Sequence, residues 1–239
     1  MSKRHNNEDK DDDTKKLSSS HHTMFVEDVS EERNPIKGKK NAYNIKPAHK
    51  KYRIFIDSFM EFEKGLHEIF NTLWDADEHD ELELRINSWG GIVKEGQNFY
   101  NIIENKFPGR TTTILDSAGY SMGALMMCMG NERICMEQCD LMFHDYSGGA
   151  IGKGGEIEAQ VKHTAKHLRN FFKSIIVDQG FLTSVEFEKM LIGQDYWMEV
   201  PEMCKRGIAT HVMVEGVKVK AKKYLKYSKG KISRKELLG

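Results

Sequence analysis

The stretch GYSMG at residues 119–123 places a serine, Ser121, between small residues at the junction of two contrasting segments. Residues 110–116 are rich in β-branched side chains and predict a strand, whereas residues 124–129 contain helix formers without β-branching. A serine at such a junction has its hydroxyl presented by a sharp turn, beside the unpaired backbone N–H groups of the helix start. This arrangement can form a nucleophile next to an oxyanion site. The alternative interpretation is that Ser121 is an ordinary N-cap of a buried helix.

Three other features supply what a serine hydrolase needs besides its nucleophile. His144 ends a short predicted strand, so a rigid element would position it as a general base. Asp195 stands next to aromatic residues and could orient and stabilise an imidazolium. Gly90 and Gly91 offer backbone N–H groups that no side chain obstructs. Nucleophile, base, orienting acid and oxyanion donors together favour acyl-transfer chemistry.

Each of these residues also has a purely structural interpretation. His144 could be a strand-end histidine bonded to a carbonyl, and Asp195 could form a turn at the end of a helix. Their joint occurrence with Ser121 favours catalysis over these separate readings. His163 and His167 lie one helical turn apart, which is a metal-ligand spacing, but solvated histidines explain them better. No metal or cofactor site is therefore predicted.

The composition fits one soluble globular domain with polar extensions, at 239 residues, 39% hydrophobic and 30% charged. No apolar run has the length of a membrane span, and the N-terminus lacks the apolar core of a signal peptide. The formal net charge of +0 predicts neither a membrane nor a specific nucleic-acid partner. Four cysteines lack a zinc-binding pattern and suggest buried thiols in a reducing cytoplasm: Cys128, Cys135, Cys139 and Cys204.

Predicted strands and helices alternate along the chain, which is typical of an α/β fold with a parallel sheet. One long predicted helix covers about 156–179. Composition divides the chain into four segments: a disordered polar arm (1–24), an extended surface segment (25–50), a globular domain (51–215) and a basic C-terminal tail (216–239).

Seven short stretches of the globular domain occur together in a consistent order and spacing. They are IFID (54–57), INSWGG (86–91), AGYSMGA (118–124), MFH (142–144), GG (148–149), DYWM (195–198) and GIA (207–209). Each is weak alone, but the ordered set resembles the Clp peptidase family, the proteolytic subunit of the ATP-dependent caseinolytic protease. The resemblance covers about residues 53–213.

The resemblance implies a serine endopeptidase with Ser121 as nucleophile, His144 as general base and acid, and Asp195 as the third triad member. The backbone N–H groups of Gly91 and Met122 would form the oxyanion hole. No cofactor or metal is implied.

The fold implied by the resemblance is the Clp/crotonase-type spiral of strand-turn-helix repeats with a protruding helical handle. The long helix after Glu156 would be that handle. Gly148 and Gly149 would lie on an edge that pairs with an extended polypeptide substrate through main-chain hydrogen bonds. The family also implies a homo-oligomer built from heptameric rings.

Several positions depart from the family pattern. Glu83, Arg85 and Asn105 stand where members carry the apolar docking pocket for the partner unfoldase. A charged surface cannot receive an apolar anchor without a desolvation cost, which argues against docking of a Clp ATPase. The family's axial-loop sequence is absent, and Gly193-Gln194 replaces charged residues that help to join two rings. Trp89 replaces a family proline in the glycine turn.

A member that works without an unfoldase would suit a protease with a dedicated substrate. One such kind is the bacteriophage Clp-like protease that trims scaffold and capsid proteins during head assembly. The acidic and basic ends of the chain would then be assembly or docking segments, and the protein would act in the cytoplasm, that of the host if it is phage-encoded.

Other classes of protein fit parts of the pattern. An esterase-type hydrolase would use Ser121, Asp195 and His211 in that chain order. A catalytically inactive assembly module could keep the Clp scaffold without its chemistry. A coenzyme-A enzyme of the crotonase type shares the fold but would not need Ser121, His144 and Asp195 together, and it ranks below the inactive module.

Overall fold

The computed structural model describes residues 15–18, 22–37, 43–57 and 66–239. Its strands are β1 (Lys15–Ser18), β2 (His22–Val29), β3 (Glu32–Pro35), β4 (Tyr43–Lys46), β5 (His49–Ile56), β6 (Glu81–Ser88), β7 (Thr111–Tyr120), β8 (Glu132–Met136), β9 (Asp140–Phe143), β10 (Tyr196–Glu199), β11 (His211–Val214) and β12 (Val217–Lys220). Its helices are α1 (Leu66–Trp74), α2 (Val93–Lys106), α3 (Met122–Cys128), α4 (Gly154–Ile176), α5 (Ser184–Met190), α6 (Val200–Lys205), α7 (Ala221–Ser228) and α8 (Arg234–Leu238).

A large mixed sheet forms the centre of the molecule, with its main path in the order β1-β2-β5-β6-β7-β8-β11-β12. The neighbours from β5 through β11 run parallel, and the outer strands on both sides pair antiparallel. Along β6, Leu82, Leu84 and Ile86 are buried on the core side. Helices α1, α2 and α3 contribute buried side chains to the same core. The predicted α/β class with a mainly parallel sheet is confirmed.

The sheet divides at β7, because this strand has two different partners on one side. Strand β8 pairs with residues 112–115 of β7, whereas β9 pairs with residues 118–120. Strand β10 then adds antiparallel to β9. The C-terminal ends of β6, β7 and β9 are thereby gathered in one place, next to the start of β10.

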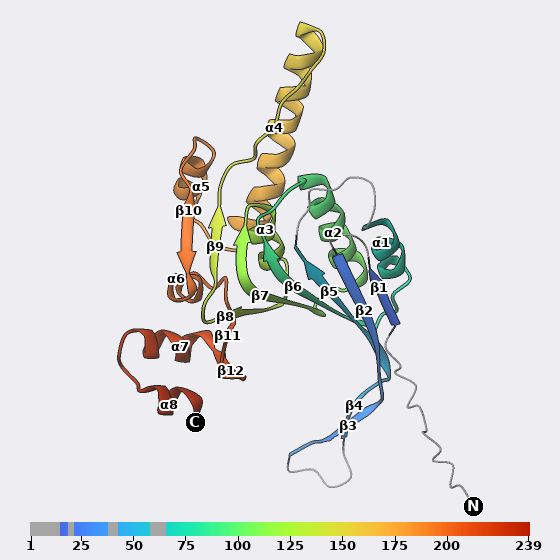
Figure 1. Cartoon of the computed structure of the whole chain (residues 1–239), viewed down its shortest axis with the longest axis vertical. Coiled ribbons are helices and arrows are strands. Elements are labelled where there is room, and N and C mark those ends of the chain that lie inside the picture. The colour runs from blue at the N-terminus through green and yellow to red at the C-terminus, as the bar shows by residue number, and fades with distance from the viewer. Residues whose placement is uncertain (1–14, 19–21, 38–42, 58–65) are drawn as a thin grey trace, which may run out of the picture.

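Helix α4 projects from the body as the expected handle (Figure 1). Its buried residues Leu168, Phe172, Ile175 and Ile176 are confined to the last turns, where the helix meets the body. In the part of the chain that is described, no helix combines the length and apolarity needed to cross a bilayer. The hairpin of β3 and β4 extends at the opposite end of the molecule (Figure 1).

The N-terminal arm is not wholly disordered as expected. Strands β1 and β2 pair with each other, and β2 pairs along its full length with β5. Met24, which is fully buried, anchors β2 to the core. The expectation therefore does not hold for residues 15–18 and 22–24, while residues 1–14 lie outside the described part.

The basic C-terminal segment is folded, and the prediction of a tail is wrong there. Strand β12 extends the sheet beside β11, and α7 and α8 follow it. Val219, Tyr224 and Leu237 are buried between the exposed lysines. A few well-spaced apolar side chains thus suffice to order a segment whose composition is dominated by charge.

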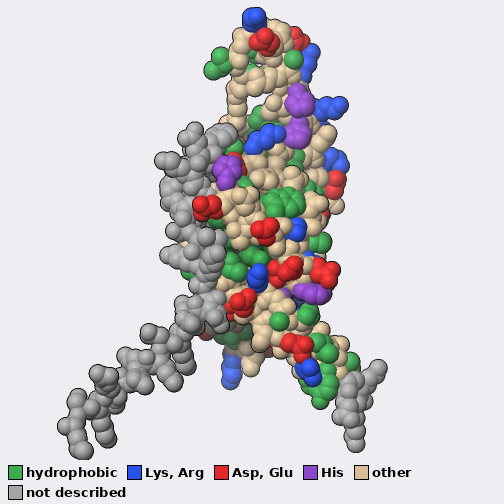
Figure 2. All heavy atoms as spheres, turned by 90° about the vertical axis from the view of Figure 1, so that its right-hand side faces the viewer, with side chains coloured by type: hydrophobic (Ala, Val, Ile, Leu, Met, Phe, Trp, Pro, Cys, Tyr) green, Lys and Arg blue, Asp and Glu red, His purple; other side chains and the backbone are tan. Residues whose placement is uncertain are grey.

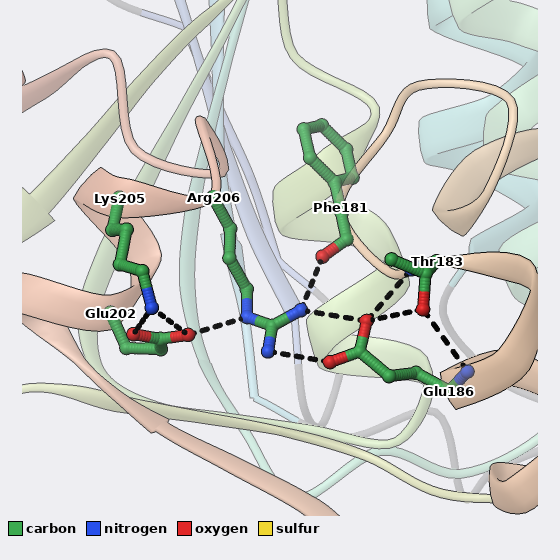
Figure 3. A network of polar contacts seen from close by, with 6 residues as sticks. All are labelled: Phe181, Thr183, Glu186, Glu202, Lys205 and Arg206. Carbon is green, nitrogen blue, oxygen red and sulfur yellow. Dashed lines mark hydrogen bonds and ion pairs between the residues drawn. The ribbon is translucent and has the colours of Figure 1, made fainter.

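Arg206 joins the elements on either side of the loop that carries Asp195 (Figure 3). Its guanidinium donates to Glu186 on α5 at 2.8 and 3.1 Å, to Glu202 on α6 at 2.8 Å, and to the Phe181 carbonyl at 3.1 Å. Glu186 also accepts from the backbone and hydroxyl of Thr183, in a capping box. One side chain therefore links α5 and α6, and the chain between them forms a loop and then β10, which pairs with β9.

Replacing Glu186 with Gln tests this network. The Arg206 guanidinium holds the pKa of Glu186 down at about 2, against its ordinary value of 4.5. Because the pKa of Glu186 is lower in the folded state than in the unfolded state, its carboxylate contributes its full stabilisation of the fold above pH 4.5. This contribution is lost as the pH falls from 4.5 towards 2. We expect Glu186→Gln to cost about 1–3 kcal/mol at pH 7 and to flatten the loss of stability between pH 4.5 and 2.

Urea unfolding from pH 2.5 to 7 measures both effects. Glu188→Gln is the matched control, because Glu188 lies on the same helix in an exposed pair with Arg169. A stability profile of Glu186→Gln that keeps the wild-type slope over this pH range would contradict the role given to Arg206.

Candidate active site

Ser121 occupies a strained turn between β7 and α3. Its φ of 55° and ψ of −121° lie in a region that L-residues with a side chain rarely adopt. Its N–H donates to the Met142 carbonyl at 3.0 Å, which joins the turn to β9. The Ser121 side chain makes no capping hydrogen bond to α3. The N-cap interpretation therefore leaves the backbone strain without an explanation.

The glycine turn after β6 lies directly against this serine. Gly90 and Gly91 have φ values of 98° and 140°. A Cβ added to Gly90 would lie 2.6 Å from the Ser121 Cβ and 3.1 Å from the Met122 nitrogen. Only a glycine permits this approach. The backbone of Gly90 thus lies close to Ser121 and to the Met122 nitrogen at the start of α3. The role of the Gly91 and Met122 N–H groups as an oxyanion hole stays a prediction.

Strand register brings the histidine and the aspartate to the same place. In the antiparallel pair of β9 and β10, Tyr196 lies opposite Phe143. Continuing this register by one residue sets Asp195 opposite His144. Among the described residues, no hydrogen bond joins the side chains of Ser121, His144 and Asp195, so their placement depends on the elements that carry them. Their catalytic roles stay a prediction.

A cavity of about 160 Å³ opens beside Ser121, and His144 lines it as well. Asp195 is not among its lining residues. Most of the wall is apolar and comes from the starts of α2 and α3 and the inner end of α4: Val93, Met122, Leu125, Phe172 and Ile176. Helical periodicity predicts that Val93 and Phe172 face the core, but it carries no signal that they meet at the serine.

Gly148 and Gly149 lie in an exposed stretch between β9 and α4 that forms neither helix nor strand. A Cβ at Gly149 would meet no atom within 4 Å, and one at Gly148 would only touch the Tyr146 ring at 3.7 Å. Packing within the chain therefore does not account for these two glycines. Their role in pairing with a substrate strand stays a prediction.

His211 is held in a different part of the sheet. Its Nδ1 lies 3.2 Å from Glu132, and burial lowers its pKa. Through β8, its position in the register corresponds to Ile114 on β7. At about 3.3 Å per residue, this position lies roughly 20 Å along the strand from Ser121. The structure thus separates the members of the esterase-type alternative.

The two histidines of α4 and the four cysteines, which are possible metal ligands by residue type, make contacts within the chain or are buried. His163 and His167 stack at 6.0 Å on α4, and His167 contacts Gln97 at 2.8 Å. No group of three or more potential metal ligands occurs among the described residues. All four cysteines are buried and unpaired, as predicted, and burial raises the pKa of Cys128 and Cys204 to about 12.

The residues at the expected docking positions are occupied by contacts within the chain. Glu83 is only 6% exposed, because Lys51 and Arg53 cover its carboxylate at 2.8 and 2.6 Å. Arg85 pairs with Asp116, while Asn105 is exposed on α2 and donates to the Asn101 carbonyl. These three positions therefore carry ion-paired or hydrogen-bonded polar side chains, and Arg85 lines a small surface pocket together with Phe55 and Asp116.

Gly90→Ala tests the contact between the two turns. The added methyl group would collide with the Ser121 Cβ at a φ of 98°, and we expect a loss of about 2–4 kcal/mol. Gly109→Ala is the matched control, because Gly109 has a φ of 76° but nothing within 4 Å of an added Cβ. Urea unfolding of both variants separates the collision from the strain, and equal losses would contradict the close approach.

The family comparison agrees with this architecture. The family model for Clp protease matches residues 37–216, three quarters of the chain. The match includes the glycine turn, the serine turn, β9, the handle and β10, and it ends before β12, α7 and α8. The expected Clp-type fold is thereby confirmed, and the family indicates a peptidase. The chain belongs to the Clp protease family.

Proposed function

We propose that this protein is a serine endopeptidase that cleaves polypeptides through an acyl-enzyme intermediate. The observation that carries the proposal is the strained turn at Ser121, which meets the Gly90–Gly91 turn at the edge of a cavity that His144 also lines. A strained serine without a capping role, placed against backbone donors, is the arrangement that nucleophilic catalysis needs.

In the proposed reaction, the Ser121 hydroxyl attacks the scissile carbonyl while His144 accepts its proton. The N–H groups of Gly91 and Met122 bind the resulting oxyanion. His144, oriented by Asp195, then returns the proton to the leaving amine as the carbon–nitrogen bond breaks. Water, deprotonated by His144, hydrolyses the ester and restores Ser121. The side chains reach hydrogen-bonding positions when substrate fills the site.

The substrate is proposed to bind as an extended strand along Gly148 and Gly149, whose backbone is exposed and unobstructed. Its side chain next to the scissile bond would enter the cavity beside Ser121. Apolar walls from Val93, Leu125 and Phe172 favour an apolar side chain and disfavour a charged one, because burying an unpaired charge is costly.

We further propose that the protein works as a homo-oligomeric ring of seven copies without an unfoldase partner. The paired charges at Glu83 and Arg85 support the second part, because they stand at positions where the family pattern has apolar residues. A dedicated substrate, as in head maturation of a bacteriophage, fits such a protease. Stimulation of the purified protein by a host Clp ATPase on an unfolded substrate would contradict this part of the proposal.

Labelling with a fluorophosphonate tests the nucleophile. We expect the wild-type protein to be labelled at Ser121, and Ser121→Ala to lose labelling entirely. His144→Ala should lower the labelling rate by a factor of about 10³ or more, whereas His211→Ala should leave it unchanged. The mass of the oligomer is measured in parallel, to show that each variant is assembled.

Two results would overturn the assignment. Normal labelling of His144→Ala together with loss in His211→Ala would favour the esterase-type triad. Absence of labelling in a folded, oligomeric wild-type protein would leave a Clp-scaffold assembly module without catalysis.

A peptide library with one varied residue before the scissile bond tests the cavity. We expect leucine and methionine to be cleaved at least 10-fold faster than aspartate or lysine, as judged by kcat/KM. Phe172→Ala should enlarge the cavity and move the preference towards bulkier aromatic side chains. An unchanged preference in Phe172→Ala would mean that this cavity does not receive the side chain.

A further inference from the structure

Three aromatic side chains form a continuous row beside the candidate active site, here called the aromatic brace: Trp89, Tyr120 and Trp197. The Tyr120 ring lies between the two indoles, 5.6 Å from Trp89 and 5.1 Å from Trp197, and both contacts are edge-to-face. Trp89 is 79% exposed and Trp197 is 58% exposed. Neither indole belongs to the core, so burial does not explain the row.

Each member of the aromatic brace comes from an element that carries a proposed catalytic group. Trp89 directly precedes the Gly90–Gly91 turn, Tyr120 directly precedes Ser121, and Trp197 follows Asp195 by two residues. The fourth element, β9, is reached by a hydrogen bond, since the Tyr120 hydroxyl donates to Asp140 at 2.8 Å. Burial and the Asp140 carboxylate raise the pKa of Tyr120 above its ordinary value.

Strand register sets the brace next to the proposed His–Asp pair. Tyr120 and Trp197 are both cross-strand neighbours of Met142 on β9. Residues two apart on a strand share a face, so His144 and Asp195 follow one step further along the same rows. The contact between Tyr120 and Trp197 therefore spans β9 immediately before the point where His144 and Asp195 lie opposite each other.

We infer that the aromatic brace is a positioning device, in which Tyr120 ties the oxyanion turn, β9 and β10 to the nucleophile turn. Among the described residues, the three proposed triad side chains have no hydrogen bonds to one another, so their alignment depends on how the strand ends are held. Edge-to-face contacts and a charge-assisted hydrogen bond provide this hold. The inference rests on the proposed function, because alignment matters only if Ser121 reacts.

Two substitutions at Tyr120 separate the parts of the aromatic brace. Tyr120→Phe removes the hydrogen bond to Asp140 and keeps the ring contacts, and we expect kcat for peptide cleavage to fall about 3- to 10-fold. Tyr120→Ala removes both, and we expect a fall of about 10- to 100-fold, because small misplacements of reacting groups are costly. KM should change less than threefold in both, since neither substitution removes a residue that lines the cavity.

Tyr52→Phe is the matched control. Tyr52 also donates to an aspartate, Asp80, at 3.3 Å, and its ring also makes an edge-to-face contact, with Phe107 at 5.8 Å. It lies on β5 and contributes to no catalytic element. We expect it to lower the unfolding temperature without lowering kcat. If the two Phe variants change kcat equally, or if Tyr120→Ala keeps the wild-type kcat, the positioning role is wrong.

Hydrogen exchange keeps this result distinct from a failure of the proposed function. Tyr120→Ala should accelerate amide exchange in residues 142–146 and 193–197, and Tyr52→Phe should not. If the wild-type protein is not labelled at Ser121, the proposed function fails, whatever the exchange shows. If Ser121 is labelled but exchange and kcat are unchanged in Tyr120→Ala, the function stands and the aromatic brace is overturned.

Discussion

The structure depends on one close approach, in which the Gly90 backbone lies where no side chain could fit beside Ser121. Two further glycines near the start of α3, Gly96 and Gly123, also lie too close to a neighbouring residue for a side chain to fit. A Cβ at Gly96 would lie 2.3 Å from the Met122 sulfur, and one at Gly123 would lie 2.8 Å from the Ser88 carbonyl oxygen. The start of α3 is thus enclosed by the backbone of β6 on one side and by α2, which packs Gly96 against the Met122 side chain, on the other. This enclosure holds the positive φ of Ser121 against its intrinsic cost.

The division of the sheet at β7 brings the ends of other strands to the enclosed serine turn. Because β8 pairs with the first half of β7 and β9 with its end, the chain can bring a second strand end to the serine without lengthening the sheet. Strand β10 adds a third from the other side of β9. The Arg206 network links α5 and α6, the helices that precede and follow Asp195 in the chain (Figure 3).

Local signals predicted the parts of the site that lie within a few residues of each other in the sequence. The glycines beside Ser121 and the strand before His144 could be found this way, and the alternating pattern predicted the parallel sheet. The antiparallel register that sets Asp195 opposite His144 could not, because β10 has four residues and no periodicity of its own. The ion pairs over Glu83 were missed for a similar reason, since their partners lie thirty residues away on β5. Composition gave a wrong prediction at the C-terminus, because burial of Tyr224 and Leu237 orders a segment in which most side chains are charged and exposed.

The folded C-terminal segment makes the chain electrically bipolar. Residues 217–239 contain eight lysines, one arginine and one glutamate, a net charge of +8, so a chain of net charge +0 carries −8 in residues 1–216. Acidic and basic side chains intermingle on the face shown in Figure 2, whereas α7 and α8 concentrate one sign at the end of the body away from the handle (Figure 1). At physiological ionic strength charges are screened beyond about 8 Å, so this asymmetry acts at contact range. A protein with an isoelectric point of about 7.1 thus combines a strongly basic C-terminal segment with an acidic remainder, and the two parts attract neighbours of opposite charge at contact range.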